Sequence, residues 1–137
     1  MSARRKSPKS KTELLGAARR ARGNARAPYS RFKVGAALES RDGRIFTGCN
    51  VENATYGLTV CAERVALWKA LSEGARRFRA VAVVTGAART TPPCGACRQL
   101  LWEYCGNVAV HLANLRGKAE SHLLAELLPH PFDRRSF

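Results

Sequence analysis

Three cysteines and one glutamate stand at spacings that could build a metal centre with a proton carrier beside it. Cys61 lies two residues before Glu63 in "GLTVCAERVALWKA", at the start of an apolar run with helical spacing. Cys94 and Cys97 lie in "PPCGACRQLLWEY", at the start of a second such run. Residues three apart lie on one face of a helix, so both sulfurs of the second motif can face the same ion. The two helix starts could therefore supply ligands to one shared site.

The ligand types point to zinc. Three thiolates with one open position are typical of a catalytic zinc site, whereas a structural zinc usually has four protein ligands. Thiolates favour zinc over magnesium or manganese, and no histidine lies near the two motifs. A C-x-x-C pair alone would also fit a redox pair or half a zinc ribbon. Zinc lowers the pKa of bound water to about 7, and the Glu63 carboxylate could then shuttle protons, which favours catalysis.

The charge of such a centre needs compensation, because three thiolates outweigh one divalent cation. Two helix N-termini aimed at the sulfurs would oppose the excess, since each carries about half a positive charge. Arg64 and Arg98 are next to the motifs. We expect their guanidinium groups to donate hydrogen bonds to the thiolates and to withdraw further charge.

Helices and strands must alternate along the chain to hold these motifs. Capping and breaking residues predict four helices, over 12–22, 61–73, 94–104 and 121–129. Thr12 is the expected N-cap of the first helix, and Gly74 is expected to end the second. Apolar runs predict strands, with a hairpin turn through Asp42-Gly43 after the first of them: 32–40, 78–86 and 107–114. A turn with a short edge strand at most is expected over 115–120. The result is an α/β fold, a three-layer α/β/α sandwich with one mixed sheet of about five strands whose centre is parallel.

Charge separates the N-terminus from the rest of the chain. The 137 residues carry a net charge of +14, and residues 1–31 hold ten Lys or Arg against one acid, Glu13. We expect residues 1–11 to form a basic, disordered leader, and residues 12–137 to form a single zinc-binding domain. A basic arm can bind nucleic acid or an anionic surface, and a mitochondrial transit peptide is also rich in arginine. We interpret the segment as a solvated tail, without specific nucleic-acid binding.

The remaining composition bears on compartment. No apolar run approaches the roughly 20 residues of a membrane helix, and the N-terminus lacks the apolar stretch of a secretory signal. We therefore expect a cytoplasmic protein that does not enter membranes. Cytoplasmic thiols stay reduced, so the five cysteines favour metal binding or catalysis over disulfides. Cys49 and Cys105 are interpreted as small core residues rather than ligands.

Long motifs in order resemble the small cytidine deaminases of pyrimidine salvage. "CNVENATYGLTVCAER" and "PPCGACRQ" carry the resemblance, which extends from residue 12 to 132 through "PYSRFKVGAAL", "DGRIFTGCNVENA" and "ELLPHPF". Zinc deaminases can use three cysteine ligands, with a glutamate that is not a ligand as general acid and base. The resemblance implies hydrolysis of cytidine and deoxycytidine to uridine and deoxyuridine, with release of ammonia.

The resemblance also implies roles for individual residues. One zinc per chain would bind Cys61, Cys94 and Cys97, and Glu63 would move protons from water to the base and the departing amine. Substrate contacts are implied for seven residues: Phe32, Asn50, Glu52, Ala54, Tyr56, Ala62 and Phe132. Asn50 and Glu52 would bind the ribose hydroxyls; the alternative is that they only cap a turn. The ring of Phe32 would pack on the base, or could equally belong to the core of a strand.

The family resemblance further implies a homotetramer with shared active sites. The loop over residues 54–56 would reach a neighbour's site, and Phe132 would stack over a substrate held by another subunit. Two alternatives remain open from the residues. The charge of +14 would suit a polynucleotide cytidine deaminase, although the three cysteine ligands and "NVENA" are of the nucleoside type. The second alternative is a zinc module without catalysis, which would leave Glu63 without a role. A deaminase of a cytosine nucleoside antibiotic is a variant of the main hypothesis.

Overall fold

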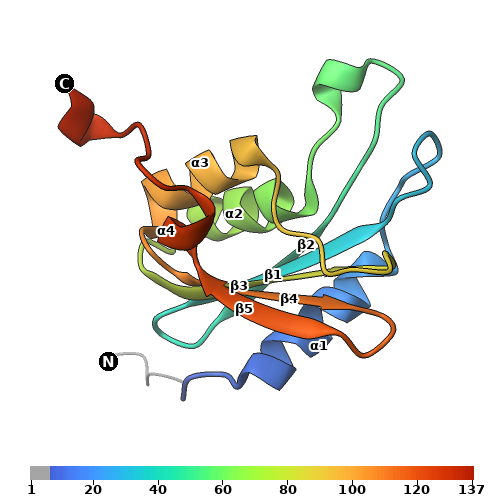
Figure 1. Ribbon diagram of the computed structural model, residues 1–137, viewed down its shortest axis with the longest axis horizontal. Coiled ribbons are helices and arrows are strands. Elements are labelled where there is room, and N and C mark those ends of the chain that lie inside the picture. Colours follow the sequence, from blue (N-terminus) through green and yellow to red (C-terminus); the bar gives the residue numbers. More distant parts are fainter. Residues whose placement is uncertain (1–6) are drawn as a thin grey trace.

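Five strands form one mixed sheet in the computed structural model, which describes residues 7–137 (Figure 1). Their order is β2-β1-β3-β4-β5, and their bounds are β1 Val34–Ser40, β2 Ile45–Cys49, β3 Phe78–Thr85, β4 Ala109–Asn114 and β5 Ala119–Leu123. Only β3 and β4 pair in parallel. The expected parallel centre is therefore confined to the two strands that α3 connects.

Helices cover both faces of the sheet, which confirms the three-layer α/β/α prediction (Figure 1). Their bounds are α1 Lys11–Arg22, α2 Ala62–Ser72, α3 Gly95–Cys105 and α4 Leu124–Leu127, with two 3-10 turns, η1 Tyr56–Leu58 and η2 Arg134–Ser136. One core lies between the sheet and the helices α2, α3 and α4, and a smaller one lies under α1. No helix within residues 7–137 has both the length and the apolar character that a bilayer crossing requires.

The central strand β3 is buried from Ala80 to Thr85, as its apolar sequence predicts. In β4 buried residues alternate with half-buried ones, although an apolar run such as 107–114 is typical of a strand buried on both faces. The reason is that α1 packs mainly over β1 and β3, so the face of β4 that carries His111 is only partly covered.

Two glycines let helices approach the sheet on opposite faces. A Cβ atom at Gly35 in β1 would lie 1.9 Å from the carbonyl oxygen of Ala18 in α1. A Cβ atom at Gly48 in β2 would lie 2.4 Å from the carbonyl oxygen of Ala62 in α2. Both distances are far below van der Waals contact, so only glycine fits without displacing the helix backbone. The first turn of α2 is thereby set directly against the sheet.

The ends of several elements differ from the prediction. Ser10, rather than Thr12, caps α1: its side chain accepts the N–H of Glu13, and Glu13 bonds back to the N–H of Ser10. Strand β5 extends to Leu123, so the final helix is much shorter than the predicted 121–129. Backbone pairing of residues 119–123 with β4 satisfies polar groups that the short helix could not.

The predicted leader is only partly within the described chain, since residues 1–6 lie outside it. Residues 7–10 have no regular structure, and α1 begins at Lys11. The backbone N–H of Lys9 donates a 2.8 Å hydrogen bond to the buried carboxylate of Glu39, which also lies 3.6 Å from the guanidinium of Arg79. The last residues of this segment are therefore anchored to the sheet.

Candidate active site

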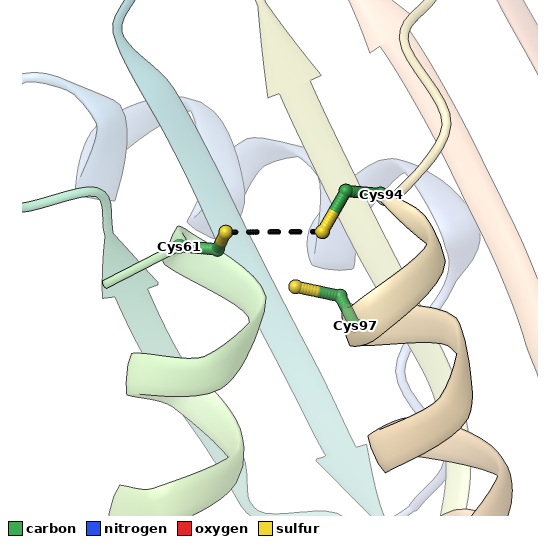
Figure 2. A group of neighbouring side chains, drawn as sticks. All are labelled: Cys61, Cys94 and Cys97. Carbon is green, nitrogen blue, oxygen red and sulfur yellow. Dashed lines mark hydrogen bonds between the residues drawn. The ribbon is translucent and has the colours of Figure 1, made fainter. Parts of the chain in front are cut away.

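The three cysteines of the two motifs converge, as their spacing suggests. Cys61 and Cys94 are the N-cap residues of α2 and α3, and Cys97 lies in the first turn of α3. Their sulfurs all lie within 4.8 Å of one another, and the sulfurs of Cys61 and Cys94 are 4.0 Å apart (Figure 2). Tetrahedral zinc with Zn–S bonds of about 2.3 Å needs sulfurs roughly 3.8 Å apart. The donor type and spacing therefore fit one zinc per chain.

Electrostatics around the sulfurs favour negative charge. Hydrogen bonding from the Cys97 thiol lowers the pKa of Cys61 to about 6, helped by the Cys94 thiol and by the charge of Arg64. The pKa of Cys97 is raised, because this thiol donates to Cys61 and is largely buried. Of these two thiols, Cys61 ionises the more readily. The Nε of Arg64 is buried without a hydrogen-bond partner in residues 7–137, and the charge of this guanidinium partly compensates the thiolate of Cys61.

Arg98 does not take the role we expected. Its Nε donates to the carbonyl of Pro93 at 2.7 Å, and one terminal nitrogen donates to the carbonyl of Leu127 at 2.6 Å. The side chain thus ties the start of α3 to the end of α4. Its recorded hydrogen bonds go to backbone oxygens and not to the thiols.

Glu63 stands beside the sulfurs in the first turn of α2, with only 6% of its surface exposed. Burial is the main cause that raises the pKa of its carboxyl to about 7, and the negative charge of the Cys61 thiolate adds to this increase. A backbone N–H and the positive charge of Arg64 act in the opposite direction and lower the pKa. A carboxyl with a pKa near neutrality can both accept and return a proton at physiological pH. Its surroundings therefore suit a proton carrier.

A cavity of about 280 Å³ opens at this point. Seven of the residues predicted from the sequence line it: Phe32, Asn50, Glu52, Cys61, Ala62, Glu63 and Cys94. The rest of its wall was not predicted: Ser30, Val34, Thr59, Val60, Val83, Thr91 and Pro92. A larger groove of about 990 Å³ lies between residues 87–92 and 117–120, but it contains none of the predicted residues. The smaller cavity is the candidate site because it joins the thiols to a buried carboxyl.

Asn50 and Glu52 both line the cavity and brace its entrance. The Asn50 side chain donates to the carbonyl of Phe32 at 2.7 Å and accepts the N–H of Val34 at 2.8 Å. The Glu52 carboxylate accepts the N–H groups of Tyr29 and Ser30 at 2.9 and 3.1 Å, and also the Ser30 hydroxyl. The hydrogen bond from that hydroxyl lowers the pKa of Glu52. Both residues therefore hold a turn and remain next to the cavity.

Phe32 lies in the loop before β1, and 38% of its surface is exposed. The alternative that it belongs to a strand core is wrong, because β1 begins only at Val34. Its position in the cavity wall is compatible with contact to a bound ring.

Three of the predicted substrate contacts do not line this cavity, although Tyr56 lines an adjoining pocket together with Glu52 and Ser30. Ala54 and Tyr56 belong to a loop that projects beyond the sheet, where Tyr56 is 77% exposed (Figure 1). Phe132 belongs to the C-terminal segment, which extends from the opposite side of the molecule; it is 66% exposed and stacks on Phe137 (Figure 1). None of the three lines the cavity of its own chain.

These features define a zinc-binding α/β enzyme in which a buried carboxyl lies beside three cysteine thiols that could hold the metal. The chain belongs to the family of the cytidine and deoxycytidylate deaminase zinc-binding region, which it matches over residues 8–112. This confirms the resemblance drawn from the motifs.

Individual relatives cover most of the chain. It is 52% identical to a cytidine deaminase of Halalkalibacterium halodurans over 87% of this chain and 91% of the relative. It is 48% identical to a cytidine deaminase of Sporosarcina psychrophila, over 89% of this chain and 90% of the relative. A crystal structure of cytidine deaminase from Burkholderia pseudomallei superposes with a TM-score of 0.88 at 48% identity, covering 90% of this chain and all of that one.

Proposed function

We propose that this protein catalyses the zinc-dependent hydrolytic deamination of cytidine and deoxycytidine to uridine and deoxyuridine, with release of ammonia. One observation carries the proposal: a single cavity contains the buried Glu63 carboxyl and the thiols of Cys61 and Cys94, with Asn50 and Glu52 also in its wall. The family and the named activities of the relatives point the same way.

Cys61, Cys94 and Cys97 would hold the zinc, which when bound acts as a Lewis acid and makes water a nucleophile at neutral pH. Glu63 accepts a proton from the attacking water and delivers it to ring nitrogen N3, so that oxygen adds at C4. The same carboxyl then takes the remaining proton of the hydroxyl added at C4 and delivers it to the amino group, so that C4=O forms as the amine leaves. The C4–N bond breaks, and water and cytidine have become uridine and ammonia.

The other side of the cavity would hold the nucleoside. Asn50 and Glu52 bind the ribose hydroxyls, while Phe32 and Ala62 contact the base. Each of these residues lines the cavity. Its volume of about 280 Å³ is near the lower end for small-molecule sites, which suits a single nucleoside.

We also propose a homotetramer with shared active sites, acting in pyrimidine salvage in the cytoplasm. The exposed aromatic rings of Tyr56 and Phe132 support the shared sites, because they project from the body of the chain and lie outside its own cavity. Ala54, in the same loop as Tyr56, would contact the neighbouring site. Symmetric assembly would bring such projecting segments to the cavities of other copies.

The test is the loss of the cytidine absorbance band on adding purified protein, with a single-stranded oligonucleotide that contains an internal cytosine as comparison substrate. We expect turnover of cytidine and deoxycytidine but not of the oligonucleotide. Residues that bind both ribose hydroxyls would clash with the next nucleotide of an oligonucleotide, which is attached through the 3′ oxygen. Efficient conversion of the oligonucleotide, falling steeply with salt as counterion release requires, would instead support a polynucleotide deaminase.

A further inference from the structure

A network of hydrogen bonds centred on Ser30 joins the two residues proposed to bind ribose and base. The Ser30 hydroxyl donates to Oε2 of Glu52 and accepts the N–H of Phe32 at 3.0 Å. We propose that Ser30 is a positioning residue that orients the Glu52 carboxylate toward the sugar and holds the Phe32 ring over the base. The inference rests on the proposed function and adds a residue to its machinery.

Phe32 is held on both sides of its peptide. Its N–H bonds to the Ser30 hydroxyl, and its carbonyl accepts the 2.7 Å hydrogen bond from the Asn50 amide. The same amide group accepts the N–H of Val34, the next residue but one. Two side chains of the cavity wall therefore fix the backbone from which the Phe32 ring projects.

The backbone between Ser30 and Phe32 has an unusual conformation. Arg31 has a φ of 59°, in the left-handed region that residues other than glycine rarely adopt. Its N–H bonds to the carbonyl of Ala27 at 2.9 Å. Such a conformation persists only where surrounding contacts impose it. The Ser30 hydroxyl supplies one of these contacts on the side of Phe32.

Glu52 has little free hydrogen-bonding capacity. Its Oε1 accepts two N–H groups, from Tyr29 and Ser30, while its Oε2 accepts the Ser30 hydroxyl. A carboxylate has about four lone-pair positions, so these donors leave roughly one, on Oε2. A ribose hydroxyl must therefore approach Oε2 beside Ser30. The two N–H groups on Oε1 thus leave Oε2 to face the substrate, and the Ser30 hydroxyl holds that oxygen in place; without the hydroxyl, Oε2 loses the donor that fixes its position beside the sugar.

A double-mutant cycle of Ser30→Ala and Glu52→Gln tests this coupling. We expect Ser30→Ala to raise KM for cytidine roughly tenfold with little change in kcat, because it removes a hydrogen bond to a charged group that binds substrate. In the Glu52→Gln background the same change should have much less effect. For 2′,3′-dideoxycytidine, which lacks both hydroxyls, the KM increase should shrink to the part transmitted through Phe32.

Controls separate positioning from general damage. Ser30→Thr keeps a hydroxyl and should restore most of the affinity. Ser72→Ala removes a 2.8 Å hydrogen bond to the carbonyl of Lys69, at the far end of α2, and should leave both kinetic constants unchanged. If Ser30→Ala does not fold, Ser30→Cys, a near-isosteric but weaker donor, replaces it in the cycle and should give a smaller rise in KM.

An unchanged KM in the serine variant would overturn the proposal, as would equal effects with and without Glu52. A loss of zinc or of kcat alone would also overturn it, because a positioning role predicts neither. Turnover of cytidine by the unaltered protein tests the proposed function separately. A chain that is active but indifferent to Ser30→Ala would refute only the role of the serine.

Discussion

The metal half and the nucleoside half of the cavity are built in different ways. Cys97 and Glu63 lie in the first turns of two helices with 1% and 6% of their surfaces exposed, and one chain supplies the whole thiol cluster. The half proposed to bind the nucleoside relies on loops: Phe32 is 38% exposed, and Tyr56 and Phe132, proposed to act at a neighbouring copy's site, are 77% and 66% exposed. Packing holds the first half, whereas hydrogen bonds between loops hold the second. The chemistry thus rests on the rigid scaffold, and substrate recognition lies on segments that variation or assembly can alter.

The largest expected effect comes from breaking the metal half. Cys94→Ala should remove bound zinc and reduce deamination to background, because a site with three ligands has no spare thiolate. Zinc per chain by elemental analysis is the readout. Cys105→Ala, at the other end of the same helix, should keep zinc, since that thiol lies outside the cluster and packs against the core. Full zinc content in the Cys94→Ala protein would contradict the assignment.

Glu63→Gln separates proton transfer from metal binding within the same half. We expect zinc content and fold to be retained while kcat falls by roughly 10³, since the amide cannot carry protons. Glu73→Gln, at the C-terminal end of the same helix, should change neither. Activity within tenfold of the unaltered protein would remove Glu63 from the mechanism.

Effects on the nucleoside half should be smaller and should appear in KM. Phe132→Ala is expected to raise KM for cytidine roughly tenfold without loss of zinc, because stacking of an aromatic ring on a base is worth about 1–3 kcal/mol. Phe137→Ala, the ring stacked on it, should have a lesser effect. Light scattering at the assay concentration tests whether copies share sites: a fully active monomer would contradict that arrangement.

The same contrast explains what could be read from the sequence. Cys94 and Cys97 were predictable as a pair because helix geometry places residues three positions apart on one face. Cys61 lies 33 positions from Cys94, so its place in the cluster, and that of Glu63 beside it, followed from the paired motifs and the family resemblance rather than from local geometry. The hydrogen bonds of Ser30 to Glu52 join residues 22 positions apart, so no local pattern indicated them. The bonds of Arg98 to α4 and the extension of β5 to Leu123 likewise depend on tertiary contacts.

The wrong prediction of Thr12 as the N-cap of α1, in contrast, could have been avoided from the local sequence. The sequence Ser10-Lys11-Thr12-Glu13 contains the S-x-x-E pattern of a capping box, and the structure has that box at Ser10. The cap of the helix therefore lies at Ser10, within the segment 1–11 that we expected to form a leader. Lys9 and Ser10 belong to the anchored part of the chain.

Ser10→Ala should accordingly destabilise the protein while sparing both halves of the site. The change removes the Ser10 hydroxyl, which accepts a 3.0 Å hydrogen bond from the N–H of Glu13. Loss of such a cap typically lowers the free energy of unfolding by about 1 kcal/mol. For a domain of this size that corresponds to a fall of roughly 3–5 °C in Tm. Thr12→Ala, within α1, should cost less, because Thr12 is not the capping residue.

Kinetic constants for cytidine should stay unchanged in Ser10→Ala, because α1 covers the face of the sheet opposite to α2 and α3, which carry the thiols. Deletion of residues 1–6 leaves the cap in place and should alter neither stability nor turnover, whereas deletion of residues 1–11 should destabilise at least as much as Ser10→Ala. If Thr12→Ala were the more damaging substitution, the cap would lie where the sequence first suggested. If Ser10→Ala lowered kcat, the two faces of the sheet would be coupled, and the separation between scaffold and site would not hold.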